Sequence, residues 1–190
     1  MGLFYRASQR ELLDIRNKIF IDFGVPALKQ QGFDKSPFST AWFGKNADIG
    51  YLYELCRLTN GNCLEMISVR IVKGDLAIQI FLNIFEIQPS LESLTQLAGI
   101  DGLKFHVPPN SISAMRLKSD DIKGPPILSY NYMFKGHKIK TYYTKIGLKK
   151  RASELALIIE ADLVNIDYYV KRWHEIHNPM LTSWNGDPIV

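Results

Sequence analysis

The sequence contains little cysteine and no long apolar run. Two cysteines, Cys56 and Cys63, occur in 190 residues, which is too few for a disulfide scaffold. The most apolar stretches are short or carry acidic residues, so we expect no membrane-spanning helix. The N-terminal residues lack the apolar core of a signal peptide. These absences predict a cytoplasmic protein without a membrane partner.

Recognisable catalytic and cofactor motifs are also lacking. The 13 glycines are scattered singly, so there is no glycine-rich loop to cradle a phosphate. His174 and His177 would share one face of a helix and are weak candidates for metal ligands. Their spacing differs from that of the metalloprotease motif, and histidines near a helix C-terminus also suit the helix dipole. The sequence therefore favours a non-catalytic protein that uses no cofactor.

The arrangement of apolar residues predicts an α+β fold in a single domain, residues 1–190. Ser8 and Glu11 have the spacing of a capping box, and apolar residues then recur at helical spacing. Pro26 should interrupt this first helix, and Gly32 should end it. A second apolar stripe predicts a long helix over 153–177. The tail that follows is expected to be irregular.

Strands are expected between these two helices, because apolar and polar residues alternate there. The predicted strands are 38–43, 49–58, 63–72, 76–87, 104–107, 114–117, 129–134 and 137–143. Consecutive strands separated by short turns favour antiparallel pairing. The expected fold is thus an antiparallel β-meander flanked by an N-terminal helix and a long C-terminal helix.

The Asn60-Gly61 dipeptide predicts a two-residue hairpin loop. Alternate residues share one face of a strand, and the aliphatic face in this register comprises Leu52, Ile67, Val69, Ile71, Ile78, Ile80, Leu82 and Ile84. The opposite face should mix aromatic rings with hydrogen-bonding groups. Its candidate site residues are Tyr51, Tyr53, Arg70, Gln79, Phe81 and Asn83. This face either lies under helices or lines a groove for a ligand or partner.

Charge is distributed unevenly along the chain. The net charge is +4, yet residues 122–153 contain eight cations and no Asp or Glu. Cations interleaved with aromatic rings suit single-stranded nucleic acid, because the cations contact phosphates while the rings stack on bases. The candidate residues are Tyr130, Lys135, Lys138, Lys140, Tyr142, Tyr143, Lys149, Lys150 and Arg151. The same segment also fits an acidic protein partner or a plain solvated face.

Several local features together resemble a known group of proteins. The helix ending at Gly32-Phe33, the pair Trp42-Phe43 and the strand Phe81-Leu82-Asn83-Ile84 resemble uncharacterised bacterial α+β domain families. Some members of those families are similar to immunity proteins of polymorphic toxin systems. The resemblance covers residues 8–87 and implies a bacterial protein that binds another protein. The basic charge departs from the acidic character expected of immunity proteins against nucleases.

Three functional hypotheses follow. The first is a non-catalytic module that binds another protein. The second is a nucleic-acid-binding protein that uses residues 130–151. The third is a small-molecule binder or enzyme with a pocket on the sheet face assigned to Tyr51, Tyr53 and Arg70. A concave pocket with convergent polar groups on that face would favour the third hypothesis, whereas a flat face would weaken it.

Overall fold

The structure, a computed structural model, describes residues 5–121 and 136–189. In these residues two N-terminal helices precede a largely antiparallel sheet, and two further helices come before its last strand. The predicted α+β class is therefore confirmed. The predicted strand 129–134 and the candidate residues Tyr130 and Lys135 lie outside the described residues.

Helix α1 (Gln9–Ile19) begins where the sequence predicts. The hydroxyl of Ser8 accepts a hydrogen bond from the backbone amide of Glu11 at 3.0 Å. This bond satisfies one of the amides that a helix N-terminus leaves free. The carboxylate of Glu11 does not complete the capping box, because it accepts a hydrogen bond from the Tyr5 hydroxyl instead.

The first helix changes pitch near Pro26, as predicted. A wide π-helical turn, η1 (Phe20–Gly24), leads into a short helix, α2 (Val25–Gln30), which has the proline in its first turn. Gly32 has a φ of +82°, and the amide of Phe33 reaches back to the last turn of α2. This glycine cap ends the helix at the predicted residue.

Seven strands of the described residues form one sheet. They are β1 (Asp34–Lys35), β2 (Phe43–Asn46), β3 (Gly50–Thr59), β4 (Cys63–Val72), β5 (Gln79–Ile87), β6 (Met115–Arg116) and β7 (Met180–Thr182). The central order is β1-β3-β4-β5-β6, while β2 also pairs with β3 and β7 also pairs with β5. All pairs are antiparallel except β5 with β7. The predicted strand 63–72 coincides with β4.

The register of the hairpin between β3 and β4 differs from the prediction by one residue. Tyr53, not Leu52, pairs with Val69, because the loop contains three residues rather than two. Asn62 is left out of the hairpin pairing, and its carbonyl oxygen accepts a hydrogen bond from the amide of Ile87. A slip of one residue moves every side chain of a strand to the other face. Tyr53 therefore faces the helices, and Leu52 faces away from them.

Short 3₁₀ turns, rather than a strand, occupy the region between β5 and β6. They are η2 (Leu94–Leu97), η3 (Leu103–His106) and η4 (Asn110–Ser113), so the predicted strand 104–107 is wrong. The side-chain amide of Asn110 donates hydrogen bonds to the carbonyl oxygens of Lys104 and Gly186. These hydrogen bonds hold η3 and η4 against the C-terminal segment, although the turns do not pair with a strand.

The predicted C-terminal helix is two helices, α4 (Lys145–Val164) and α5 (Ile166–Ile176). α4 begins earlier than predicted because the Thr144 hydroxyl accepts a hydrogen bond from the amide of Gly147 and caps the helix there. The predicted strand 137–143 is reduced to one bridge between Ala77 and Lys138. The chain then returns to the sheet as β7, so the tail is more ordered than expected.

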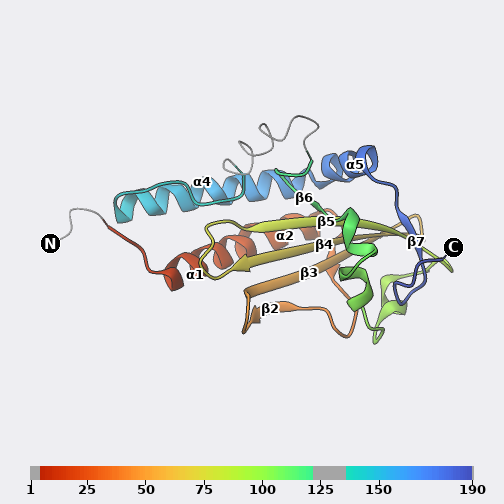
Figure 1. Cartoon of the computed structure of the whole chain (residues 1–190). Helices are drawn as coiled ribbons and strands as arrows, with labels where there is room; N and C mark the ends of the chain where they lie inside the picture. The colour runs from red at the N-terminus through yellow and green to blue at the C-terminus, as the bar shows by residue number, and fades with distance from the viewer. Residues whose placement is uncertain (1–4, 122–135, 190) are drawn as a thin grey trace.

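Helices and 3₁₀ turns lie on opposite sides of the sheet (Figure 1). On the helical side, Leu55, Ile67 and Leu82 pack with residues of α1, α2, α4 and α5 in the main core. On the other side, Phe85 and Phe105 belong to a second, smaller core beneath the turns. This smaller core covers one end of the sheet face, beside the cleft described below.

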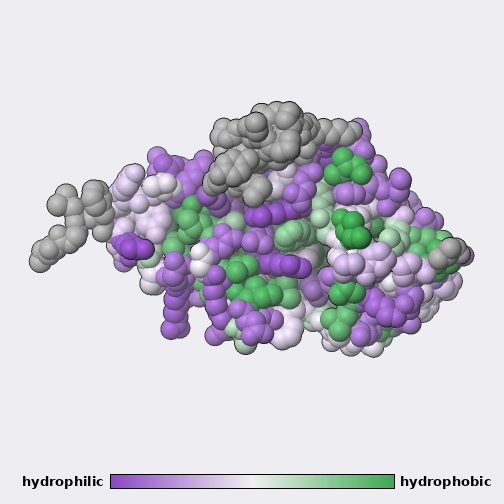
Figure 2. All heavy atoms as spheres, in the orientation of Figure 1, coloured by the Kyte–Doolittle hydropathy of each residue, from purple (hydrophilic) through white to green (hydrophobic). Residues whose placement is uncertain are grey.

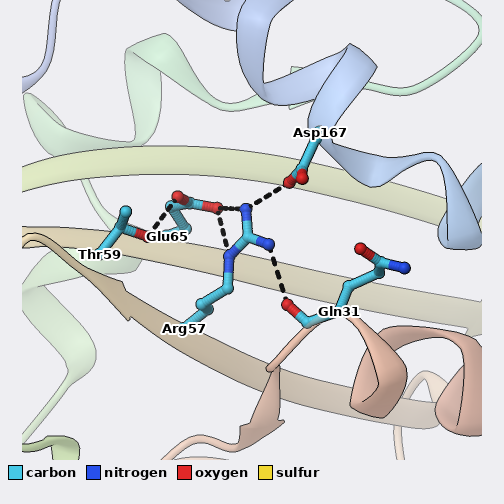
Figure 3. A network of polar contacts seen from close by, with 5 residues as sticks. All are labelled: Gln31, Arg57, Thr59, Glu65 and Asp167. Atoms are coloured by element: carbon cyan, nitrogen blue, oxygen red, sulfur yellow. Dashed lines mark hydrogen bonds and ion pairs between the residues drawn. The ribbon is translucent and has the colours of Figure 1, made fainter.

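Polar contacts of Arg57 join the sheet to the helices (Figure 3). The Arg57 guanidinium donates two hydrogen bonds to Glu65 on the neighbouring strand, at 3.0 and 2.6 Å. It also donates to the carbonyl oxygen of Gln31 at the end of α2 and to Asp167 at the start of α5. Thr59 donates a further hydrogen bond to Glu65. One arginine thus ties two strands to both helical segments.

Candidate functional site

The sheet face that turns away from the helices carries a cleft. Strands β3, β4 and β5 supply its floor, and residues of η3 and η4 supply one wall. Two adjoining hollows of about 320 and 620 Å³ share the lining residues Ser68, Arg70 and His106. Figure 2 views the molecule from this side and shows hydrophobic and hydrophilic residues interleaved over the strands. Concave sites with apolar walls and a few polar groups are typical of ligand binding.

A carboxylate and an imidazole meet between the two hollows. The Nε2 atom of His106, at the end of η3, lies 3.2 Å from Oε1 of Glu54 on β3. The other carboxylate oxygen accepts a hydrogen bond from the backbone amide of Trp42 at 2.9 Å. Burial lowers the pKa of His106, Glu54 opposes this effect, and the charge of Arg70 adds to it.

Arg70 brings an unpaired positive charge to the cleft. Its guanidinium carbon lies 5.2 Å from the centroid of the Phe81 ring, in a cation–π contact. Its side chain has no hydrogen bond or ion pair with the described residues. Arg116 pairs with Phe81 from the adjacent strand β6 and so belongs to the same face. A stacked guanidinium without an acidic partner is well suited to a carboxylate or phosphate.

Ser68 lies on the floor, directly across the strands from Glu54 and Phe81. Its hydroxyl oxygen is buried and has no hydrogen-bond partner among the described residues. Buried polar atoms are nearly always paired, so this hydroxyl leaves a hydrogen-bonding capacity unused at the junction of the two hollows. The hydroxyl is not hydrogen-bonded to His106, so these two residues do not form an activated nucleophile.

The structure brings together only part of the predicted sheet-face site. Arg70, Phe81 and Asn83 line the smaller hollow. The side chain of Asn83 is committed to the fold, because its amide donates to Asn110 and its oxygen accepts from Ser113. These bonds attach η4 to β5 and position the wall of the cleft.

Three predicted residues of that site do not contribute to the cleft. Tyr51 and Tyr53 lie on the helical face, which corrects their assignment and follows from the one-residue shift in register. The Tyr53 hydroxyl donates to Asn17 of α1, and burial raises the pKa of Tyr53 to about 12. Gln79 donates its amide to Asp75 and supports the preceding turn.

Sequence reasoning missed the most informative pair, Glu54 and His106. Glu54 lies within the predicted strand 49–58 and His106 within the predicted strand 104–107, and neither was identified as a site residue. The pair depends on a contact between residues 52 positions apart in the chain, which no local pattern records. An isolated acid in an otherwise apolar strand is the one signal that could have indicated a buried partner.

The residues of the predicted basic segment lie in different environments in the structure. Tyr142 is half-buried, and its ring lies 6.5 Å from that of Tyr5, so it packs against the core rather than forming an open stacking platform. Tyr143 is 63% exposed, while Lys138 lies beside the sheet edge at its bridge to Ala77. Lys140 is exposed in the loop before α4. Binding of nucleic acid by this segment stays a prediction.

Three of the predicted cations lie in the second turn of α4. Lys149 and Lys150 are exposed, whereas Arg151 pairs with Glu154 at 2.8 Å and donates to the carbonyl oxygen of Thr141. The hydrogen bond from Arg151 lowers the pKa of Glu154. Arg151 therefore has a structural role, and Lys149 remains available to a partner.

The two histidines of the sequence analysis lie at the end of α5. The rings of His174 and His177 each contact Trp173, at 5.3 Å between centroids. Burial lowers the pKa of His177. In residues 5–121 and 136–189, no three His, Cys, Asp or Glu side chains gather closely enough to hold a metal ion. None of the helices described combines the length and apolar content that crossing a membrane requires.

The cleft is the one predicted site at which the structure combines a hollow, an unpaired charge and aromatic walls. Comparisons of the chain with protein-family models, with curated proteins and with solved structures found no match. The geometry of the cleft is therefore the basis for proposing a function.

Proposed function

We propose that this protein binds a small organic anion, a carboxylate attached to an apolar body, in the cleft on the open face of the sheet. The observation that carries the proposal is the guanidinium of Arg70, which is stacked on Phe81 and lacks an acidic partner among the described residues. This corresponds to the third functional hypothesis, which a concave face with convergent polar groups was expected to favour.

The charge balance of the cleft supports an anion. The Glu54 carboxylate already has polar partners in His106 and the amide of Trp42. Arg70 and its neighbour Arg116 have no ion pair with the described residues, so this face has two cations for one carboxylate. Arg binds carboxylates through two parallel hydrogen bonds, and aromatic stacking holds its planar group in position for them.

The walls support an apolar body attached to the anion. Phe81, Phe85 and Phe105 line the smaller hollow, and Trp42 and Leu103 line the larger one. Trp42 is 42% exposed and Leu103 is 56% exposed. Covering such surfaces with a ligand contributes roughly 25 cal/mol for each Å² of apolar area removed from water.

Binding, rather than covalent catalysis, suits the arrangement. A serine nucleophile needs a base within hydrogen-bonding distance, and the hydroxyl of Ser68 has no such partner among the described residues. The Nε2 atom of His106 is directed to Glu54 instead. Glu54 and His106 therefore act as fixed polar groups that orient a ligand.

A matched pair of probes tests the proposal. We expect 3-phenylpropanoate to shift the backbone NMR signals of Ser68, Arg70 and Phe81, whereas its uncharged amide shifts them little. The substitution Arg70→Gln removes charge-assisted hydrogen bonds worth about 1.5–3 kcal/mol. It should therefore weaken carboxylate binding by about 10- to 100-fold.

The control is Arg10→Gln, which removes the same charge from α1 on the other side of the sheet. The Arg10 side chain is 92% exposed, so its replacement should leave binding unchanged. Equal binding of the acid and the amide, or full affinity in the Arg70→Gln protein, would refute the proposed function.

A further inference from the structure

A second concave surface lies on the helical side of the molecule, between α1 and α4. It has a volume of about 660 Å³ and a predominantly apolar lining. We call it the α1–α4 groove. Its lining residues are Glu11, Ile15, Lys18, Ile19, Asp22, Phe23, Lys145, Leu148, Lys149, Ala152, Ser153, Ala156 and Leu157.

The sequence explains why the two helices leave this groove open. α1 and η1 place Ile15, Ile19 and Phe23 at intervals of four residues on one face. The facing part of α4 carries small side chains, including Ala152 and Ser153, so the space between the helices is not filled. Phe23 is 37% exposed and Leu157 is 64% exposed. Apolar side chains of this size gathered in one groove are typical of an interaction surface.

The charges around the groove are unequally compensated. Lys18 pairs with Asp22 at 2.7 Å, and Glu11 accepts the hydroxyl of Tyr5. Both acidic residues of the lining are thus engaged within the chain. Lys145 and Lys149 have no ion pair with the described residues. The lining contains three lysines, Lys18, Lys145 and Lys149, and two acidic residues, so its net charge is positive.

The position of these lysines strengthens the argument. Lys145 and Lys149 lie in the first two turns of α4, and the first turn contains no acidic residue. The N-terminus of a helix carries a partial positive charge, so cations there oppose the helix dipole. Helix stability does not account for them, whereas an anionic partner in the groove would.

We infer that the α1–α4 groove binds an amphipathic helix of another protein, with an apolar stripe in the groove and acidic residues beside Lys145 and Lys149. The stretch from Ile15 to Phe23 spans about 12 Å, or roughly two turns of a bound helix. Apolar anchors spaced three and four residues apart would meet the groove. This inference concerns a surface separate from the anion cleft and gives the protein-binding hypothesis a specific location.

Synthetic peptides of about 14 residues, long enough to cover the groove at 1.5 Å per residue, test the inference by fluorescence anisotropy. The first has leucines at helical spacing and glutamates elsewhere. The second replaces the glutamates with lysines, and the third keeps the first composition but scrambles the leucine stripe. We expect the first peptide alone to bind, with an affinity that falls as salt screens the lysines.

Variants locate the binding surface. Ser153→Trp should fill the groove, and Leu157→Asp should remove an anchor; both side chains are exposed, so the fold should persist. Each should weaken peptide binding by roughly tenfold or more, as should the double variant Lys145→Glu/Lys149→Glu. Circular dichroism spectra and melting temperatures verify that these variants remain folded.

Matched controls change the same chemistry elsewhere. Lys171→Glu reverses a charge on α5, and Ile112→Asp replaces an apolar side chain that is 75% exposed on η4. Neither should affect the peptide, and neither should Arg70→Gln, which tests the cleft alone. Binding of the basic peptide or unchanged affinity in the groove variants would overturn the inference. A dimer that Ser153→Trp abolishes would also overturn the inference, because the groove would then serve self-association. Binding to phosphatidylserine vesicles that the same substitution abolishes would overturn it too, because the groove would then serve a membrane.

Discussion

Replacing Arg57 with methionine should strongly destabilise the protein. The Glu65 side chain is 3% exposed, and the Arg57 side chain is 17% exposed. Without the guanidinium, the Glu65 carboxylate would retain one side-chain hydrogen-bond donor among the described residues, the Thr59 hydroxyl. Breaking a buried ion pair by removing one partner costs about 3–5 kcal/mol, because the remaining charge is uncompensated.

The second acidic partner of Arg57 should matter much less. The Asp167 side chain is 69% exposed, and exposed ion pairs contribute about 0–1 kcal/mol. Asp167→Asn should therefore change the free energy of unfolding by less than about 1 kcal/mol. The contrast between the two variants separates the buried part of the network in Figure 3 from its solvated part.

Urea denaturation at pH 7, followed by circular dichroism, measures both effects. Domains are usually stable by about 5–15 kcal/mol in total, so Arg57→Met should shift the midpoint clearly. The double variant Arg57→Met/Glu65→Leu should recover much of the loss, because it removes the stranded charge along with its partner. If Arg57→Met lowers the free energy of unfolding by less than about 1 kcal/mol, the reasoning is refuted. It is also refuted if the double variant loses as much free energy of unfolding as Arg57→Met and Glu65→Leu lose separately when added together.

Two further predictions concern titration and thiol reactivity. Burial alone would raise the pKa of Asp162, but hydrogen bonds from His137 and Lys118 outweigh it and hold the pKa below its usual value. These contacts stabilise the fold above the unfolded pKa of about 3.9, and the stabilisation is lost as pH falls through the folded pKa. Between pH 6 and pH 3, the free energy of unfolding should therefore decrease less in Asp162→Asn than in the wild type. Burial raises the pKa of the Cys56 thiol to about 12 and that of Cys63 to about 11. Mass spectrometry should accordingly find slow alkylation by iodoacetamide at pH 8 in the folded protein and rapid alkylation in urea, whereas rapid labelling of folded Cys56 would contradict its burial.

The two cysteines also show that the hairpin register decides which face of the sheet a side chain occupies. Cys56 pairs with Met66, and Cys63 pairs with Thr59, so the two thiols lie on opposite faces of the sheet. The two-residue loop predicted from Asn60-Gly61 placed them on one face. The actual loop is set by hydrogen bonds from the segment after β5, including that from the amide of Leu91 to the carbonyl oxygen of Gly61. A dipeptide preference cannot report such a contact.

The candidate site was partly predictable for the same reason. The shared face of Arg70, Phe81 and Asn83 follows from the alternation of side chains along β4 and β5, and the sequence analysis correctly placed these three residues on one face. His106 reaches Glu54 only because η3 crosses the sheet as a 3₁₀ turn. That crossing depends on Phe105 entering the second core and on the hydrogen bond from Asn110 to Gly186, which lies 76 residues away in the chain.

The sequence by itself determined the features that depend on near neighbours. Ser8 starts α1, Gly32 ends α2, and the aliphatic alternation of β4 and β5 defines the face that meets the helices, since caps and strand periodicity act over a few residues. Tertiary structure decided the rest: the register of β3, the position of β7 and the partners of Arg57 and Glu54. Each of these depends on which distant groups satisfy buried polar atoms, and this is settled only when the whole core packs.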